Sequence, residues 1–74
     1  MGKLSTLSGR EVRQILEAHG FTFVRQRGSH MVLQLKSGGS TVTVVVPDHT
    51  QLKTGTLRSI IRQCGLPRSL FEAD

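Results

Sequence analysis

Three short β segments follow one another through the middle of the chain, and the brief gaps between them strongly limit its fold. Residues typical of strands run over 21–27, 30–36 and 41–46. Gly28 and Ser29 end the first segment, and the second gap, residues 37–40, has the Ser-Gly-Gly-Ser composition of a hairpin loop. Pro47 ends the last segment because proline lacks the amide that a strand ladder needs, and a polar loop over 48–53 follows. The pattern predicts an antiparallel three-stranded sheet.

A helix is predicted before these segments. Ser8 and Glu11 have the spacing of a capping box, and Gly20 is placed to end the helix. The apolar positions between them follow helical spacing and are Val12, Ile15 and Leu16. The polar residues that we expect to face solvent are Arg10, Arg13 and Glu17.

A second helix is predicted after them. Thr54 is a plausible N-cap, and Gly65 ends the helix. Its apolar stripe consists of Leu57, Ile60, Ile61 and Cys64. Residues 68–73 should add one short helical turn that packs Leu70 or Phe71 on the body.

The order α-β-β-β-α predicts one α+β domain over residues 1–74, with both helices on one face of the sheet. Alternation assigns the covered face to Met31, Leu33, Leu35, Val42, Val44 and Val46. The open face should carry His30, Val32, Gln34, Thr41, Thr43 and Val45. The first segment alternates imperfectly, so its faces stay unassigned. This is the layout of double-stranded-RNA-binding domains, which read the shape of A-form RNA.

The charge balance favours a polyanionic partner. Ten Lys and Arg stand against five Asp and Glu, and seven of the ten are Arg. The net charge of +5 therefore points to nucleic acid ahead of a membrane surface. Only three Phe and no Tyr or Trp are present, which argues against a base-stacking platform.

Other classes of protein fit the sequence poorly. Seventy-four residues leave no room for a dinucleotide cleft between two halves. No apolar run is long enough for a membrane helix, and the first residues lack the apolar stretch of a signal peptide. A lone cysteine cannot form an internal disulfide, so the expected compartment is the cytoplasm.

His30 is the residue best suited to carry chemistry. It follows Gly28 and Ser29 directly, on the predicted open face, with Arg25 and Arg27 just upstream. Histidine exchanges protons near neutral pH, so it could deprotonate a 2′-hydroxyl of RNA or protonate the leaving 5′-oxygen. Gly28 would permit close approach of a phosphate, and Ser29 could donate a hydrogen bond to it. The alternative is a polar histidine on a solvated strand.

The second helix offers a candidate phosphate site. Lys53 and Thr54 stand at its start, where free amides and the positive end of the helix dipole favour an anion. Arg58 and Arg62 are four residues apart on its exposed side and could follow a phosphate backbone. An ordinary capped helix with a solvated face would explain the same residues.

Metal and cofactor chemistry is not expected. His19, His30 and His49 are far apart in the sequence, and no cluster of Cys or carboxylates joins them. Cys64 lies on an apolar stripe, which favours a buried structural thiol. His49 is either a solvated loop residue or a second phosphate or proton-transfer contact.

Taken together, these features resemble the HicA toxins of bacterial and archaeal toxin–antitoxin systems. The similarity extends from about Ser8 to Leu70. It is carried by Gly20-Phe21, Arg25, Gly28-Ser29-His30, Pro47, His49 and the run from Gly55 to Leu66. The Gly-Ser-His block and the Gly-Thr-Leu-Arg helix are specific together and weak apart.

The resemblance implies an mRNA interferase with a double-stranded-RNA-binding-like fold, His30 as the catalytic residue, and a HicB antitoxin that covers the site. Family members often carry a second His or another polar residue after the catalytic one, where this chain has Met31. A mechanism that uses two adjacent histidines is therefore not available.

The resulting hypothesis is a metal-independent endoribonuclease with His30 as general acid or base. A non-catalytic double-stranded-RNA-binding module is the alternative. A third possibility is a protein-interaction module that uses Val32 and Val45 on the open face.

Overall fold

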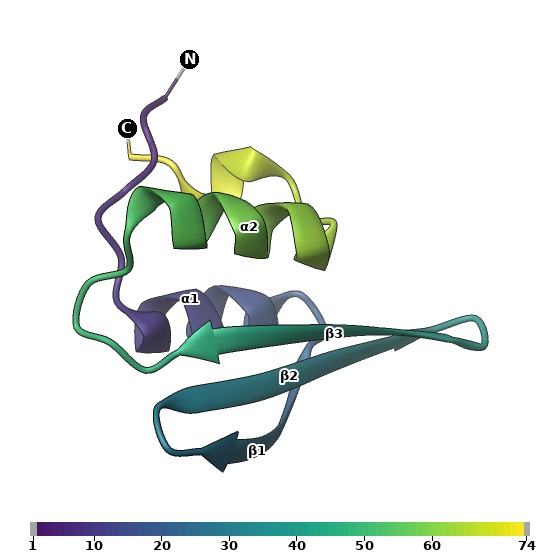
Figure 1. Ribbon diagram of the computed structural model, residues 1–74. Helices are drawn as coiled ribbons and strands as arrows, with labels where there is room; N and C mark the ends of the chain where they lie inside the picture. The colour runs from purple at the N-terminus through teal and green to yellow at the C-terminus, as the bar shows by residue number, and fades with distance from the viewer. Residues whose placement is uncertain (1, 74) are drawn as a thin grey trace.

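A three-stranded antiparallel sheet carries both helices on one face (Figure 1). The computed structural model describes residues 2–73. In chain order the elements are α1 (Gly9–Ala18), β1 (Thr22–Arg27), β2 (His30–Ser37), β3 (Ser40–Pro47), α2 (Thr54–Cys64) and a short 3-10 helix, η1 (Arg68–Phe71). Strand β2 lies between β1 and β3. The α+β class and the α-β-β-β-α order confirm the predicted fold.

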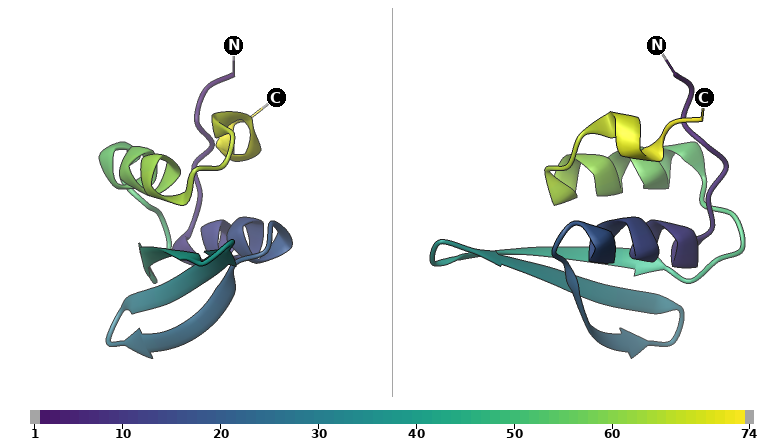
Figure 2. Two further views of the ribbon diagram at one scale, coloured as in Figure 1. Left: turned by 90° about the vertical axis from the view of Figure 1, so that its right-hand side faces the viewer. Right: turned by 180° about the vertical axis from the view of Figure 1, so that it is seen from behind.

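One core fills the space between the helices and the sheet. Its members with no exposed surface are Val12, Leu16, Leu33, Val44, Val46 and Phe71. Leu35 and Val42 are half-buried and pack against this core. The predicted covered face of β2 and β3 is therefore correct. Phe71 of η1 belongs to the same core, and Figure 2 shows η1 beside α2.

Strand β1 owes its imperfect alternation to a β-bulge. Its register with β2 shifts between Phe23 and Arg25, so Val24 is an extra residue on this strand. Phe23 pairs with Leu33 on the helix side of the sheet. Arg25 pairs with Val32 on the open side, and beyond the bulge the alternation resumes.

Two residues are more buried than the sequence suggests. Val32 was expected on the open face, yet only 7% of it is exposed. It sits on the central strand with Arg25 and Val45 on either side, and these neighbours shield it from water. Leu52 falls in the predicted polar loop but is 5% exposed and belongs to the core. Its amide donates to the carbonyl of Leu7, and this hydrogen bond holds the loop against the segment before α1.

Two further expectations were wrong in detail. Arg13 was expected in solvent but is half-buried, with its guanidinium carbon 3.9 Å from the centre of the Phe23 ring. Thr54 is the first residue of α2, not its N-cap. Lys53 occupies the N-cap position and makes no side-chain capping bond.

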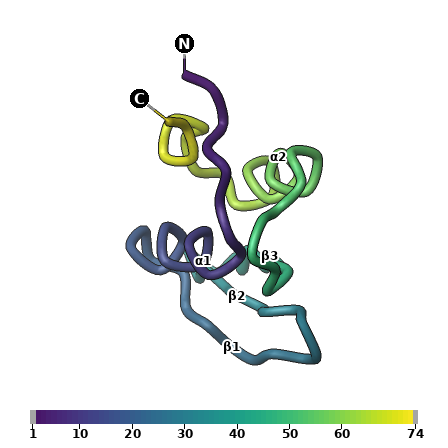
Figure 3. Tube along the Cα trace, turned by 90° about the vertical axis from the view of Figure 1, so that its left-hand side faces the viewer, coloured from purple at the N-terminus to yellow at the C-terminus, as the bar shows by residue number. Residues whose placement is uncertain are grey.

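The two helices begin at the same end of the molecule. Figure 1 shows the starts of α1 and α2, the β1–β2 turn and the end of β3 on one side, with the β2–β3 hairpin at the other. Figure 3 looks onto this end, which we call the turn end and define by residues 8–10, 26–30 and 47–54. Among residues 2–73, none of the helices has the length and apolar character that a membrane span requires.

Candidate active site

His30 stands at the turn end as the first residue of β2. It pairs with Arg27 on one side and Pro47 on the other, and it is exposed. Directly opposed residues of an antiparallel pair point to the same face, with Cβ atoms about 4.5–5.5 Å apart. The Arg27 side chain is therefore the immediate neighbour of the imidazole on the open face.

Arg25 extends this cationic group along the open face. It is exposed and pairs with Val32, one row further from the turn than Arg27. The strand register thus brings together three residues that the sequence singled out: Arg25, Arg27 and His30. Beside them lie the exposed apolar side chains of Val24 and Val45, which are 42% and 44% exposed.

In the turn before His30, the carbonyl groups of Gly28 and Ser29 accept hydrogen bonds, whereas the amide groups of the same two residues are free to donate. Gly28 has a φ of +55°, which glycine adopts without strain. Its carbonyl accepts from the Gln26 side chain at 2.9 Å, and the Ser29 carbonyl accepts from the amide of Asp48 at 2.5 Å. Among the described residues, the amides of Gly28 and Ser29 donate to no other backbone group. These amides and the Ser29 hydroxyl can therefore serve an anion.

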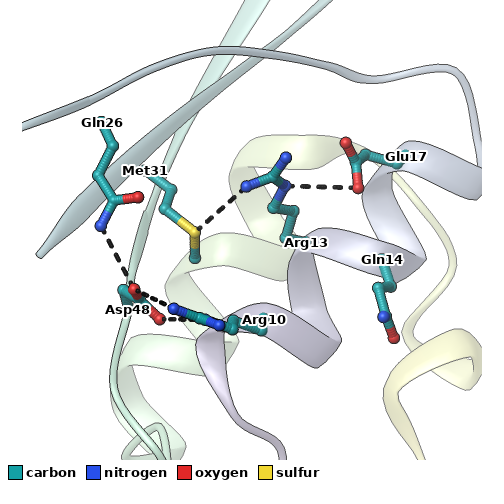
Figure 4. Close-up of a pocket in the computed structure, with 7 residues that line it drawn as sticks. All are labelled: Arg10, Arg13, Gln14, Glu17, Gln26, Met31 and Asp48. Carbon is teal, nitrogen blue, oxygen red and sulfur yellow. Dashed lines mark hydrogen bonds and ion pairs between the residues drawn. The ribbon is translucent and has the colours of Figure 1, made fainter.

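Asp48 joins the turn to α1, an arrangement that the sequence analysis missed. Its carboxylate accepts from Arg10 Nε at 3.2 Å and Nη2 at 3.5 Å, and from Gln26 Nε2 at 3.3 Å (Figure 4). Donation from Arg10 holds the pKa of the Asp48 carboxyl below its ordinary value, although partial burial acts in the opposite direction. Arg10 and Asp48 are 38 residues apart, so no spacing rule could connect them.

The start of α1 is packed tightly on the end of β3. The Gly9 amide donates to the His49 carbonyl at 2.9 Å. A Cβ atom on Gly9 would collide with the Pro47 carbonyl oxygen, so glycine permits this close approach. His49 itself is exposed and next to Asp48, at the turn end but in the loop, not on the sheet.

The remaining predicted residues lie on the helix layer. Lys53 and Thr54 are exposed at the start of α2, at the same end as His30. The first turn of α2 has no side-chain cap, so its amides are free to bind an anion. Arg58 and Arg62 are exposed further along α2. The structure thus splits the predicted set into an open-face group around His30 and a helix-layer group on α2.

A cleft of about 410 Å³ lies between α1 and β1, and Figure 4 shows the residues that line it. Gln26 and Met31, which line it, form a cross-strand pair one position from Arg27 and His30. Successive strand residues point to opposite faces, so the cleft opens on the helix side while His30 faces the open side. His30 does not line this cleft, and its side chain is exposed at the turn end.

This surface places a side chain able to exchange protons beside groups able to bind an anion. An exposed imidazole stands next to a guanidinium and a turn with free donors. In the described part of the chain, no three His, Cys, Asp or Glu side chains are placed to hold a metal ion together. Cys64, predicted to be a structural thiol, is buried in the core.

Comparison with known proteins adds one finding. Residues 9–66 match the model of a protein family described as the HicA toxin of bacterial toxin-antitoxin systems. The matched segment runs from the first residue of α1 past the end of α2, so it contains every residue of the candidate site. No curated protein matches the chain.

Proposed function

This chain belongs to the family of HicA toxins of bacterial toxin–antitoxin systems, and from that membership and its site we propose that it is an endoribonuclease that cleaves mRNA. One observation carries the proposal: His30 is exposed beside Arg27 and follows a turn whose amides are free. A toxin of such a system acts on a cellular target, and the net charge of +5 favours a nucleic acid.

The proposed reaction needs only the substrate and this surface. The 2′-hydroxyl of one nucleotide loses its proton and attacks the adjacent phosphorus, and the bond to the 5′-oxygen of the next nucleotide breaks. The 5′-oxygen takes up a proton, which leaves a 2′,3′-cyclic phosphate and a 5′-hydroxyl. His30 serves as base for the first proton or acid for the second. Arg27 and the amides of Gly28 and Ser29 stabilise the charge that develops on the phosphate.

The helix layer provides the second part of the proposed RNA surface. Lys53, Thr54, Arg58 and Arg62 all lie on exposed positions of α2 or its N-cap, and α2 contains no acidic residue. With Arg25 and Arg27 on the sheet, they would hold the RNA backbone on both sides of the turn end.

The family implies an antitoxin partner, and we propose that it is of the HicB type and covers the His30 surface. The exposed Val24 and Val45 beside Arg25 offer such a partner apolar contact together with positive charge. An acidic partner would therefore fit. Its complex with this chain should weaken as salt is raised.

A non-catalytic double-stranded-RNA-binding module is the second candidate function. The α-β-β-β-α order and the excess of cations favour it. Such a module would bind RNA equally well with and without the His30 imidazole, and it would never cut it.

Cleavage should continue in EDTA, because the proposed reaction takes its nucleophile from the RNA and uses His30 for one of its two proton transfers. The measurement is cleavage of an unstructured oligonucleotide with EDTA or with Mg²⁺, and mass spectrometry of the products. We expect similar rates and a 2′,3′-cyclic phosphate in both. Loss of cutting in EDTA that added Mg²⁺ or Mn²⁺ restores would contradict the metal-independent reaction.

Arg27→Ala should weaken RNA binding and lower its dependence on salt. Each phosphate contact to single-stranded RNA contributes about 0.7 to the slope of log affinity against log salt. Binding is measured with a 2′-O-methyl oligonucleotide, which cannot be cut by the proposed route. The matched control is Arg68→Ala, which removes the same charge from η1, where Arg68 pairs with Glu72 at 2.7 Å. If the slopes of log affinity against log salt are equal for the two variants, Arg27 does not contact the RNA phosphates.

A further inference from the structure

We infer that Asp48 is a positioning residue for cleavage: clamped by Arg10 and Gln26, it fixes the turn that carries His30 so that the donors of that turn face the phosphate. Asp48 is not among the residues that the sequence singles out, and it does not lie on the open face with His30. The inference rests on the proposed function, since it assigns a role within that reaction.

The main chain of Asp48 is fastened to the turn. Its amide donates to the Ser29 carbonyl at 2.5 Å, and the preceding residue, Pro47, is the β3 partner of His30. Any shift of residues 47 and 48 relative to the sheet must therefore move Ser29 and His30 as well.

The side chain of Asp48 holds the same turn from the other direction. Gln26 Nε2 donates both to Asp48 Oδ2 at 3.3 Å and to the Gly28 carbonyl at 2.9 Å. One amide group thus bridges the carboxylate and the turn. Together with the Asp48 amide, this bridge engages both carbonyls of the turn. The Gly28 carbonyl and the Ser29 amide belong to one planar trans peptide and point in opposite directions, so the Ser29 amide faces away from the Gln26 bridge.

Arg10 links Asp48 to the start of α1. Its Nε and Nη2 approach the two carboxylate oxygens of Asp48 as a fork (Figure 4). Arg10 comes directly after Gly9, the glycine that packs on Pro47. The Asp48 side chain is 20% exposed and that of Arg10 is 80% exposed. An ion pair with one partner in water contributes little to overall stability, so its effect should be on orientation.

The matched variants are Asp48→Asn and Glu72→Gln. Both keep the side-chain shape, both remove one negative charge, and both break an arginine ion pair, with N–O distances of 3.2 Å and 2.7 Å in the native protein. Asparagine cannot accept the Arg10 fork on two oxygens, and its amide group would face the guanidinium. Glu72 belongs to the C-terminal segment, and its ion-pair partner is Arg68 of η1.

The experiment measures kcat and KM of the full chain on an RNA oligonucleotide, together with amide NMR spectra. We expect Asp48→Asn to lower kcat roughly 10- to 100-fold, the range that a small misplacement of catalytic groups produces. KM should not rise, because a negative charge has been removed near a polyanion. The amide resonances of Gly28, Ser29 and His30 should shift in this variant alone, while Glu72→Gln keeps the native kcat and turn resonances.

The outcomes separate the inference from the proposed function. A folded Asp48→Asn variant with native kcat and native turn resonances overturns the inference, as does a fall in kcat that Glu72→Gln reproduces. A native chain that cuts no RNA overturns the proposed function and the catalytic role assigned here with it. If Asp48→Asn fails to fold, Arg10→Ala is the second variant, because it removes the guanidinium that binds the Asp48 carboxylate and changes only an exposed side chain. A native kcat in Arg10→Ala likewise overturns the inference.

Discussion

His30→Ala should lower the rate of RNA cleavage by roughly 10²- to 10⁴-fold and leave the fold intact. A positioned acid or base typically accelerates a reaction roughly 10²- to 10⁴-fold, and this chain offers no second histidine on the same face of the sheet. His30 is exposed at the start of β2 and takes no part in the core, so its removal should cost little stability. The measurement is the single-turnover cleavage rate of both proteins, with circular dichroism to show that both are folded.

His19→Ala is the matched control. His19 is also exposed, but it caps the far end of α1, where its ring nitrogen lies 2.9 Å from the Ile15 carbonyl oxygen. This variant should cut RNA at the native rate. A folded His30→Ala protein with full activity would contradict the proposed mechanism. If neither the native chain nor His30→Ala cuts RNA and both bind it equally, the double-stranded-RNA-binding module becomes the better description.

Gly9→Ala should destabilise the protein by about 3 kcal/mol, the upper part of the range for overpacking. Helix propensity alone predicts the opposite, since alanine is favoured over glycine by about 1 kcal/mol inside a helix. The new methyl group would overlap the Pro47 carbonyl oxygen, however, and a backbone carbonyl of a paired strand cannot rotate away. The start of α1 must then move off β3 and lose its bond to the His49 carbonyl.

Gly55→Ala isolates the steric cause. Gly55 lies in the first turn of α2, as Gly9 does in α1, but nothing lies within 4 Å of the position its Cβ would take. This variant should be as stable as the native chain or slightly more so. Urea unfolding followed by circular dichroism gives both free energies. Equal stability of the two variants would mean that α1 does not depend on the close contact at Pro47.

The fold could be predicted because its signals are local. The capping box of Ser8 and Glu11 forms as expected, with both of its hydrogen bonds present. The two hairpin loops stand where glycine interrupts the β segments, and the alternation over β2 and β3 identifies the covered face. Each of these features depends on residues that are close together in the sequence, so a reading along the chain could find them.

The site was predicted only in part because some of it depends on long-range contacts. The position of His30 on the open face follows from alternation, but that of Arg25 does not, because the bulge at Val24 resets the register of β1. The pairing of Arg10 with Asp48 has no local signature at all. Burial of Val32 likewise depends on its neighbours in other strands, which a period of two cannot reveal.

The same difference between local and distant contacts bears on the order of folding. Strands β2 and β3 are joined by a short hairpin loop, so they can pair early. The start of α1 reaches the end of β3 only after the chain between them has closed a loop, with Arg10 and Asp48 38 residues apart. We expect the contacts between the start of α1 and the end of β3 to form last and to open first in native-state hydrogen exchange. RNA or antitoxin bound at the turn end would stabilise the folded state by its binding free energy. The toxin should therefore resist unfolding most when RNA or antitoxin is bound.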